Sequence, residues 1–387
     1  MPKFLNIVAT CVILSACAQE TNLETQKSEN KESTEEQVVL DERYVLNDFL
    51  SVNEALDQKV DEIFERLSPE HRVAQLIMPA IGEHGQKESV IDELVKDQLI
   101  GGILLLNGTK EEFKNWVDKY DRWNDSLNTP PFLYSADAEP SLINRKIRNS
   151  APVPRANTVK SGKEVIEVAE LISAELNEIG INYNFAPVVD VAPNKTVGWR
   201  GFGHAPDSLI TWSNLFVKSS QDKGVIATAK HFPGHGNVVG DTHKKLLFID
   251  GEMTELENYP SLIENGVLSI MVAHIAVINN EKYGTNGLPA TTSKAIVTDL
   301  LRDSLNFQGL IVTDAMNMGG VKDVENASIL AVKAGCDIVL MPLNARATHA
   351  ELLNLYNSDN ELKKQVDESA KRILRMKLCL GWSPTQK

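Results

Sequence analysis

The chain has 387 residues, enough for one large domain or two of average size. Hydrophobic residues make up 42% of it and charged residues 24%, which is ordinary for a globular protein that carries its own core. The formal net charge is −14 and no block of Lys and Arg occurs, so we expect no nucleic-acid partner and no attraction of the folded surface to anionic membranes.

The N-terminus has the pattern of an export signal. Lys3 precedes an apolar stretch over residues 4–16, which is too short to span a bilayer and has the size of a signal-peptide core. The stretch ends in Leu14-Ser-Ala-Cys17, which resembles a bacterial lipobox. We therefore predict a lipoprotein signal peptide over residues 1–17, lipidation of Cys17, and a place in the cell envelope, either facing the periplasm or on the outer membrane. An ordinary secretory signal with an incidental cysteine is the alternative.

Residues 18–45 are predicted to be an acidic, flexible tether. Positions 18–42 contain eight acidic side chains and two lysines, with little that a core could bury. Such a segment cannot offset the entropy lost on ordering. Of the cysteines outside the predicted signal, Cys336 and Cys379 lie in apolar surroundings and are expected to be buried thiols rather than a disulfide or a metal pair.

From about residue 46 to 387 we predict a single catalytic domain with the α/β fold of a (β/α)8 TIM-type barrel. Short apolar runs alternate with longer amphipathic ones, which indicates parallel strands joined by helices. The predicted helices include 163–179, 208–222 and 294–305. The predicted strands are 73–81, 100–106, 131–136, 181–191, 225–230, 268–277, 310–313 and 338–341. A doubly wound open sheet is disfavoured because no Gly-x-Gly-x-x-Gly turn or phosphate-binding loop follows a strand.

Polar side chains stand at the ends of five of these strands. They are Asp137, Asp190, the pair Lys230-His231, His274 and Asp314. Since the carboxyl ends of barrel strands converge on one face, we expect these groups to meet around one pocket.

The most specific segment is Lys230-His-Phe-Pro-Gly-His-Gly236, followed by Asp241-Thr-His243. With Asn184-Phe-Ala-Pro-Val-Val-Asp190, Arg200-Gly-Phe-Gly203 and Ile311-Val-Thr-Asp314, it resembles glycoside hydrolase family 3, in the β-N-acetylhexosaminidase branch. The resemblance runs from about residue 72 to 382. It implies a retaining enzyme that removes terminal β-linked GlcNAc from peptidoglycan fragments or from chitin and glycan oligosaccharides, without a cofactor or metal.

The resemblance also implies roles for individual residues. Asp314 would be the nucleophile that forms a covalent glycosyl-enzyme intermediate, and a helix N-cap is the alternative reading of this position. His243, held by Asp241 two residues earlier, would be the acid and base, where most glycosidases use a second carboxylate. Its alternative is an ordinary surface histidine. The family's sugar-binding set corresponds to Asp137, Arg145, Arg200, Lys230 and His231.

The sequence departs from the family pattern after the third predicted strand. The usual Asp-x-Glu-Gly-Gly is replaced by Asp137-Ala-Glu139-Pro140-Ser141. Pro140 fixes φ, and neither residue has the conformational freedom of glycine. The loop beside the sugar is therefore open to a different path and a different substrate preference.

Other functions remain open from sequence alone. They are a β-glucosidase of the same family, a β-GlcNAc phosphorylase, a non-catalytic sugar-binding lipoprotein, and a metallohydrolase using His231 and His235. The glycines and proline around that histidine pair disfavour the helix on which a metal site with this spacing would form. We expect a monomer that meets the membrane only through its lipid anchor.

Overall fold

The computed structural model describes residues 43–191, 195, 197–203 and 206–384, and these belong to one compact unit. The predicted signal peptide 1–17 with Cys17, and positions 18–42 of the predicted tether, lie outside the described residues. Among the helices described, none is long and apolar enough to cross a membrane.

Seven strands form one parallel sheet in the order β12-β10-β8-β7-β5-β3-β2. A separate parallel pair joins β1 to β13, and Pro79, which has no backbone N–H, separates β1 from β2. A single bridge between Val312 and Ile338 links β12 to the residue before β13. The strands of these two sheets are β1 (Ile77–Met78), β2 (Ala80–Ile81), β3 (Gly102–Leu105), β5 (Leu133–Ala136), β7 (Tyr183–Asn184), β8 (Ile226–Phe232), β10 (Ser269–Val272), β12 (Leu310–Thr313) and β13 (Val339–Leu340).

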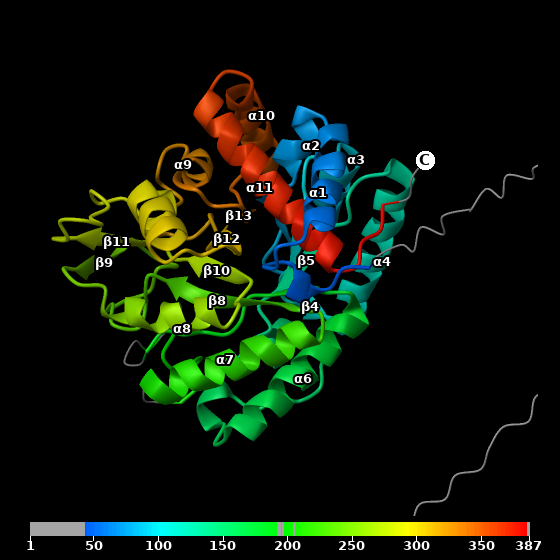
Figure 1. Ribbon diagram of the computed structural model, residues 1–387. Helices are drawn as coiled ribbons and strands as arrows, with labels where there is room; N and C mark the ends of the chain where they lie inside the picture. The colour runs from blue at the N-terminus through cyan, green and yellow to red at the C-terminus, as the bar shows by residue number, and fades with distance from the viewer. Residues whose placement is uncertain (1–42, 192–194, 196, 204–205, 385–387) are drawn as a thin grey trace, which may run out of the picture. The chain divides into compact units, whose positions relative to one another are not determined.

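Helices surround these strands on the outside, as Figure 1 shows, in the manner of a TIM barrel. The α-helices are α1 (Glu54–Arg66), α2 (Pro69–Ala74), α3 (Glu88–Lys96), α4 (Lys110–Leu127), α5 (Ile143–Lys146), α6 (Gly162–Ile179), α7 (Pro206–Asp222), α8 (Tyr259–Glu264), α9 (Ala327–Ala334), α10 (Ala345–Tyr356) and α11 (Asn360–Cys379). Short helical turns are η1 (Leu46–Asp48), η2 (Ala156–Thr158), η3 (Thr254–Asn258) and η4 (Ala290–Thr292), and η5 (Ala295–Ser304) is a longer helix of the π type. The predicted α/β fold with parallel strands is confirmed as a TIM-barrel-like sheet.

Local signals explain α6, which corresponds to the predicted helix 163–179. In α6 the Ser161 side chain accepts a hydrogen bond from the Glu164 backbone N–H, and Gly180 closes the other end at φ 95°. Capping of this kind satisfies backbone groups that have no partner inside a helix. Val165, Ile172 and other apolar residues of one face are buried, so the helix covers the sheet.

Three strand predictions were wrong in their limits. Within the run 181–191 only β7 (Tyr183–Asn184) is a strand. The run 73–81 begins inside α2, because Ser68 caps that helix and Pro69 occupies its first turn, so the strand starts only at Ile77. The run 268–277 divides into β10 and β11 (Ile275–Ile278), and β11 pairs outside the main sheet with β9 (Leu247–Asp250). A further small parallel pair joins β4 (Gly108–Thr109) to β6 (Ile147–Arg148). An apolar run alone does not distinguish a helix end or a second strand from a single strand.

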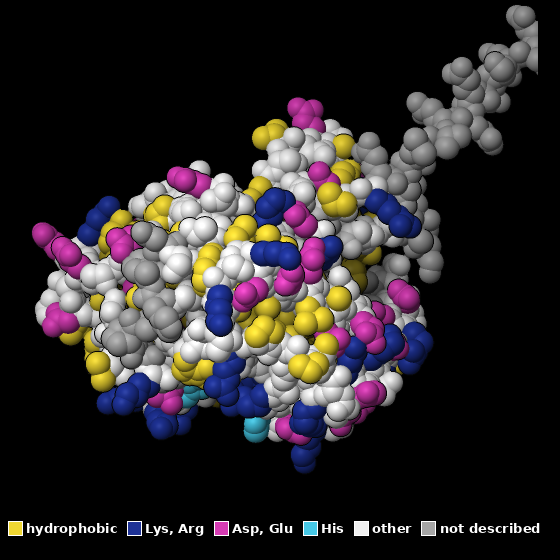
Figure 2. Space-filling view, turned by 90° about the horizontal axis from the view of Figure 1, so that it is seen from below, with side chains coloured by type: hydrophobic (Ala, Val, Ile, Leu, Met, Phe, Trp, Pro, Cys, Tyr) yellow, Lys and Arg dark blue, Asp and Glu magenta, His cyan; other side chains and the backbone are white. Residues whose placement is uncertain are grey.

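Cys336 and Cys379 are free and buried, as predicted. On the face that Figure 2 presents, Lys and Arg side chains are interspersed with Asp and Glu, and hydrophobic side chains lie between them. The negative net charge is therefore not gathered into one acidic surface on this side.

Candidate active site

A cavity of about 360 Å³ lies at the carboxyl ends of the parallel strands. Seven of the eight predicted site residues line it, namely Asp137, Arg145, Arg200, Lys230, His231, His243 and Asp314. The eighth, Asp241, binds His243. Loops after strands of a barrel converge on this face, which explains why positions so far apart in the sequence meet here.

Asp314 follows β12 directly. Its backbone N–H donates to the Val272 carbonyl at 2.9 Å, and its Oδ1 accepts the Ala315 N–H at 2.8 Å. Burial opposes the charged form, but His231 and His274 outweigh burial, so the pKa of Asp314 lies below its ordinary value. The carboxylate is therefore ionised at neutral pH. Only Oδ1 accepts the hydrogen bond from the Ala315 N–H, and Oδ2 takes no part in that bond.

His243 and Asp241 form a pair on the loop between β8 and β9. The His243 Nδ1 lies 2.8 Å from Asp241 Oδ1, which also accepts the His243 backbone N–H at 3.0 Å. Burial opposes ionisation of Asp241, yet the bonds from His243 lower the pKa of the carboxyl. An ionised Asp241 requires Nδ1 to carry the proton, so Nε2 is the ring nitrogen available to the cavity. The His243 side chain is 62% exposed, which leaves it accessible to a bound sugar.

Lys230 and Arg200 are joined through a carboxylate that the sequence analysis did not assign to the site. Glu139 is buried, lies 2.6 Å from Lys230 Nζ and accepts two hydrogen bonds from the Arg200 guanidinium. Lys230 also donates to Asp137 at 3.1 Å. Burial disfavours the charged form of Lys230, but the negative charges of Asp137 and Glu139 outweigh burial and raise the pKa of Lys230. Lys230 and Arg200, which were predicted to bind the sugar, therefore also hold the buried Glu139.

Asp137 is the partly exposed carboxylate of this group. Its side chain is 24% exposed, and Lys146 lies 3.5 Å away. Burial disfavours the charged form of Asp137. The positive charges of Lys230, Lys146 and Arg200 outweigh this effect and hold the pKa of Asp137 well below its ordinary value. Asp137 is thus an ionised hydrogen-bond acceptor facing the cavity. Arg145, from α5, also lines the cavity but is exposed.

Asp190 and His274 do not line the cavity, contrary to the expectation that all strand-end groups would meet there. Asp190 is buried beneath His231, with Oδ2 at 2.6 Å from the His231 Nδ1, and it accepts the His235 backbone N–H at 2.8 Å. His274 is also buried, between the Thr291 hydroxyl at 2.9 Å and the Ala315 carbonyl at 3.0 Å. Both side chains therefore support the residues that face the cavity.

His231 and His235, the pair that a metallohydrolase would use, form hydrogen bonds with other residues. His235 Nε2 lies 3.1 Å from the Thr242 hydroxyl, and His231 Nδ1 is occupied by Asp190. In the described part of the chain, His, Cys, Asp and Glu form no group of three or more that could hold a metal ion.

Glu255 is a second buried carboxylate that sequence analysis missed. It accepts backbone N–H groups from Val191 at 2.5 Å, from Gly236 at 2.7 Å and from Asn237 at 3.3 Å. Burial and the negative charge of Asp190 raise the pKa of Glu255 to about 7. It lies in η3, in a segment without a recognisable motif, so only the three-dimensional contacts connect it to the loop of Asp241 and His243.

The departure at Pro140-Ser141 has a structural role. Pro140 is buried, and the Ser141 hydroxyl donates to the Trp199 carbonyl at 3.3 Å and accepts the Ala156 N–H at 3.1 Å. Glycine has no side chain to make these bonds. Ser141 thus connects the loop after β5 to Trp199, which lines the cavity beside Arg200.

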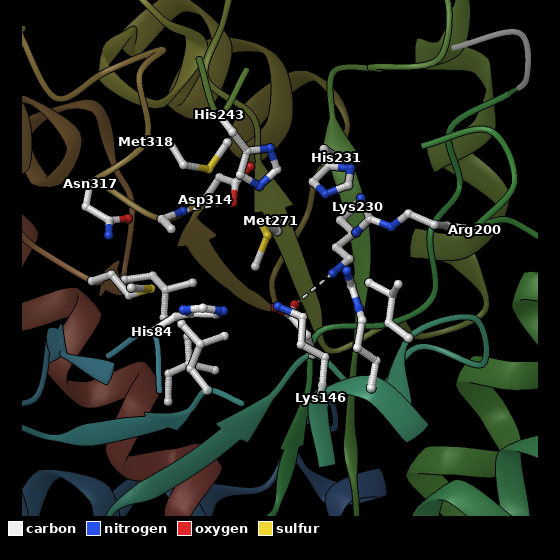
Figure 3. A pocket seen from close by; sticks show the side chains of 18 of the residues that line it. His84, Lys146, Arg200, Lys230, His231, His243, Met271, Asp314, Asn317 and Met318 are labelled. Carbon is white, nitrogen blue, oxygen red and sulfur yellow. Dashed lines mark hydrogen bonds and ion pairs between the residues drawn. The ribbon is translucent and has the colours of Figure 1, made fainter. Parts of the chain in front are cut away.

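Figure 3 shows the resulting arrangement. Arg200 and Lys230 lie on one side of the cavity, His84 and Asn317 on the other, and Asp314 between them with His243 beside it. The cavity therefore has Asp314 and His243 side by side on its wall and a group of fixed charges at one end.

Comparison with known proteins identifies the family. The profile described as "Glycosyl hydrolase family 3 N terminal domain" matches residues 69–376. The chain belongs to glycosyl hydrolase family 3. The resemblance inferred from sequence is confirmed, and the class of protein is that of glycoside hydrolases.

Curated relatives and solved structures agree with this assignment. Beta-hexosaminidase A of Pseudoalteromonas piscicida is 34% identical over 245 residues, which are 56% of this chain and 41% of that protein. A beta-hexosaminidase of Hydrogenovibrio crunogenus is 30% identical over 64% of this chain and 73% of its own length. The structure of a beta-N-acetylhexosaminidase from Beutenbergia cavernae has a TM-score of 0.73 and 26% identity, covering 80% of this chain and 98% of that one. A family 3 beta-N-acetylglucosaminidase from Paenibacillus has a TM-score of 0.75 and 25% identity, covering 83% and 64%.

Proposed function

We propose that this chain is a retaining β-N-acetylhexosaminidase that removes terminal β-linked GlcNAc from oligosaccharides. The observation that carries the proposal is the placement of an ionised Asp314 and an Asp241-bound His243 on one cavity. The names and structures of the relatives support the same activity.

In the first step Asp314 Oδ2 attacks the anomeric carbon and forms a glycosyl ester. His243 Nε2–H gives its proton to the glycosidic oxygen as the bond to the leaving group breaks. The Asp241 carboxylate accepts the hydrogen bond from His243 Nδ1–H, so that proton stays on the ring. Before the Nε2 proton is transferred, Asp241 also stabilises the positive charge of the imidazolium. In the second step the neutral Nε2 takes a proton from water, and the hydroxide oxygen displaces Asp314 from the sugar.

The sugar is held at the charged end of the cavity. Asp137 accepts hydrogen bonds from sugar hydroxyls, while Lys230, Arg200, Arg145 and His231 donate. Glu139 keeps two of these cations in place, so their orientation is set before the substrate arrives.

We infer that the strands close into a complete eight-stranded barrel. The bridge between Val312 and Ile338 and the pairing of β13 with β1 support this closure, since β1 continues through Pro79 into β2 of the main sheet.

We further propose that a lipid on Cys17 tethers the enzyme to the cell envelope, where it acts as a monomer on peptidoglycan fragments, chitin oligosaccharides or glycan trimmings. The lipobox-like Leu14-Ser-Ala-Cys17 and the acidic segment that follows support this proposal. Incorporation of labelled palmitate into wild type but not Cys17→Ala would support it, whereas equal labelling of both, or of neither, would contradict it.

A panel of aryl β-glycosides tests the activity itself. We expect hydrolysis of the 4-nitrophenyl β-GlcNAc substrate in preference to the β-glucoside. A preference for glucoside would reject the hexosaminidase assignment. Release of GlcNAc-1-phosphate in phosphate buffer, instead of free GlcNAc, would identify a phosphorylase.

A further inference from the structure

The loop that carries Asp241 and His243 begins at a turn that does not line the active-site cavity. The loop leaves β8 through residues 233–237 and ends at β9. Its tip has little packing of its own, since the His243 side chain is 62% exposed and that of Asp241 30%. The position of these two residues therefore depends on how the rest of the loop is held.

In the turn, three successive backbone N–H groups donate to carboxylates. The N–H of His235 donates to Asp190 at 2.8 Å. Those of Gly236 and Asn237 donate to Glu255 Oε2 at 2.7 Å and 3.3 Å. Successive N–H groups that converge in this way form a concave site for a negative charge. Asp190 and Glu255 are both buried, so the protein fills this site with its own side chains and fixes the turn before any substrate binds.

The other oxygen of Glu255 holds a second segment. Glu255 Oε1 accepts the Val191 N–H at 2.5 Å. The two segments approach each other closely, because a Cβ on Gly236 would overlap the carbonyl oxygen of Val191. Glu255 thus joins the turn to the segment that follows β7.

The side chain of His235 connects the turn to the tip of the loop. Its Nε2 lies 3.1 Å from the Thr242 hydroxyl, and both side chains are buried. Burial lowers the pKa of His235 below its ordinary value, so the ring is neutral at neutral pH. Thr242 stands between Asp241 and His243 in the chain, so holding Thr242 restrains the backbone of both.

We propose that Glu255 and His235 are positioning residues for the acid and base, His243. Glu255 fixes the turn 235–237, and His235 holds Thr242 in a fixed relation to that turn, so that His243 Nε2 faces the leaving group. Neither positioning residue lines the active-site cavity. The inference rests on the proposed function and adds to it a role for the second histidine of the motif over residues 230–236.

Glu255 borders a different cavity, which separates its effect from sugar binding. This cavity has a volume of about 700 Å³ and shares no lining residue with the active-site cavity. A substitution of Glu255 therefore reaches the substrate only through the backbone segments that the carboxylate holds.

Thr242→Val is the first test, because it removes the hydroxyl and nearly preserves the size of the side chain. We expect kcat/KM for 4-nitrophenyl β-GlcNAc to fall about tenfold or more, as the acid and base is displaced. For the 2,4-dinitrophenyl glycoside the fall should stay below about threefold, because the better leaving group needs little protonation. Thr242→Ser retains the hydroxyl and should recover most of the loss.

Glu255→Gln is the second test. Gln has nearly the size of Glu but accepts hydrogen bonds at one atom instead of two, so either Val191 or the turn loses its partner. We expect the same dependence on the leaving group as in Thr242→Val. Circular dichroism establishes that each variant is folded. If Glu255→Gln does not fold, Glu255→Asp, which keeps the charge but shortens the reach, takes its place with the same expected result.

Thr298→Val is the matched control. Its hydroxyl donates to the Ala334 carbonyl at 2.7 Å, and Thr298 lines neither cavity, so kcat/KM should stay at the wild-type value on both substrates. Equal losses on both substrates in the Thr242 and Glu255 variants, or no loss in either, would overturn the inference. So would a Thr242→Ser variant as impaired as Thr242→Val. A wild-type protein that does not cleave 4-nitrophenyl β-GlcNAc would instead reject the proposed function.

Discussion

The backbone N–H of Gly319 donates a hydrogen bond to the carbonyl of His243 at 3.0 Å. The next residue, Gly320, donates in the same way to the Thr242 carbonyl at 2.9 Å. Gly319 follows Asp314 by five residues, so the loop of the proposed nucleophile holds the loop of the proposed acid and base. A Cβ on Gly319 would lie 2.4 Å from the Lys244 carbonyl carbon and oxygen, which leaves room only for glycine.

Gly319→Ala should therefore move His243 without touching the substrate. We expect kcat/KM for 4-nitrophenyl β-GlcNAc to fall about 10²-fold, because a displacement of about 1 Å in a catalytic group has that effect. The fall should be smaller for a 2,4-dinitrophenyl glycoside, whose leaving group needs little protonation. Gly162→Ala is the control, since its Cβ would meet only a terminal methyl of Leu215. Equal losses on both substrates would show that Gly319 does not act through His243.

Asp241→Asn tests the pairing with His243. The amide removes the negative charge that stabilises the imidazolium and no longer requires a proton on Nδ1. We expect kcat for poor leaving groups to fall about 10²-fold or more, with the acid and base limbs of the pH profile displaced. An unchanged pH profile and leaving-group dependence would assign Asp241 a purely structural role.

Glu139→Gln tests the buried carboxylate between Lys230 and Arg200. The substitution preserves size but leaves two buried cations with one fewer negative partner. Removing one partner of a buried ion pair costs about 3–5 kcal/mol, and we expect the free energy of unfolding to decrease by that order. KM should rise as well, because the two cations lose their fixed positions. Denaturant unfolding together with kinetics would measure both effects, and wild-type values of both would contradict the assignment.

Glu255 predicts a pH dependence of stability. Its pKa is raised to about 7 in the folded protein, above the ordinary value of 4.5. Its contribution to stability is therefore fully present below about pH 4.5 and is lost as pH rises through 7. Unfolding free energies of wild type and Glu255→Gln, measured across this window, should show the wild-type advantage decreasing with pH. An advantage that grows with pH would mean that the three backbone N–H groups, rather than burial, control the titration.

Much of the site was predictable because its residues follow strands at recognisable motifs. Asp314 and Lys230 stand at the carboxyl ends of strands, and the barrel arrangement brings such ends together. The pair Asp241 and His243 is separated by one residue, so the sequence itself indicated their contact. The family assignment, and with it the glycoside hydrolase class, is confirmed by the profile match.

The remaining features depend on contacts between distant segments. Glu139 was visible in the sequence, but its position between Lys230 and Arg200 requires strand β8 and the loops after β5 and β7 to come together. Glu255 carries no motif, and its three backbone partners come from two other loops. The start of β1 was misplaced because the apolar run across residues 73–81 hides the capped helix α2.

The central claim is that Asp314 becomes covalently bonded to the sugar. Incubation with a 5-fluoro-GlcNAc glycosyl fluoride slows the second step, so the intermediate accumulates and intact-protein mass spectrometry detects it. The account predicts a single added glycosyl group, located by peptide sequencing on Asp314 and absent from Asp314→Asn. Turnover without any adduct, or an adduct on another residue, would contradict it.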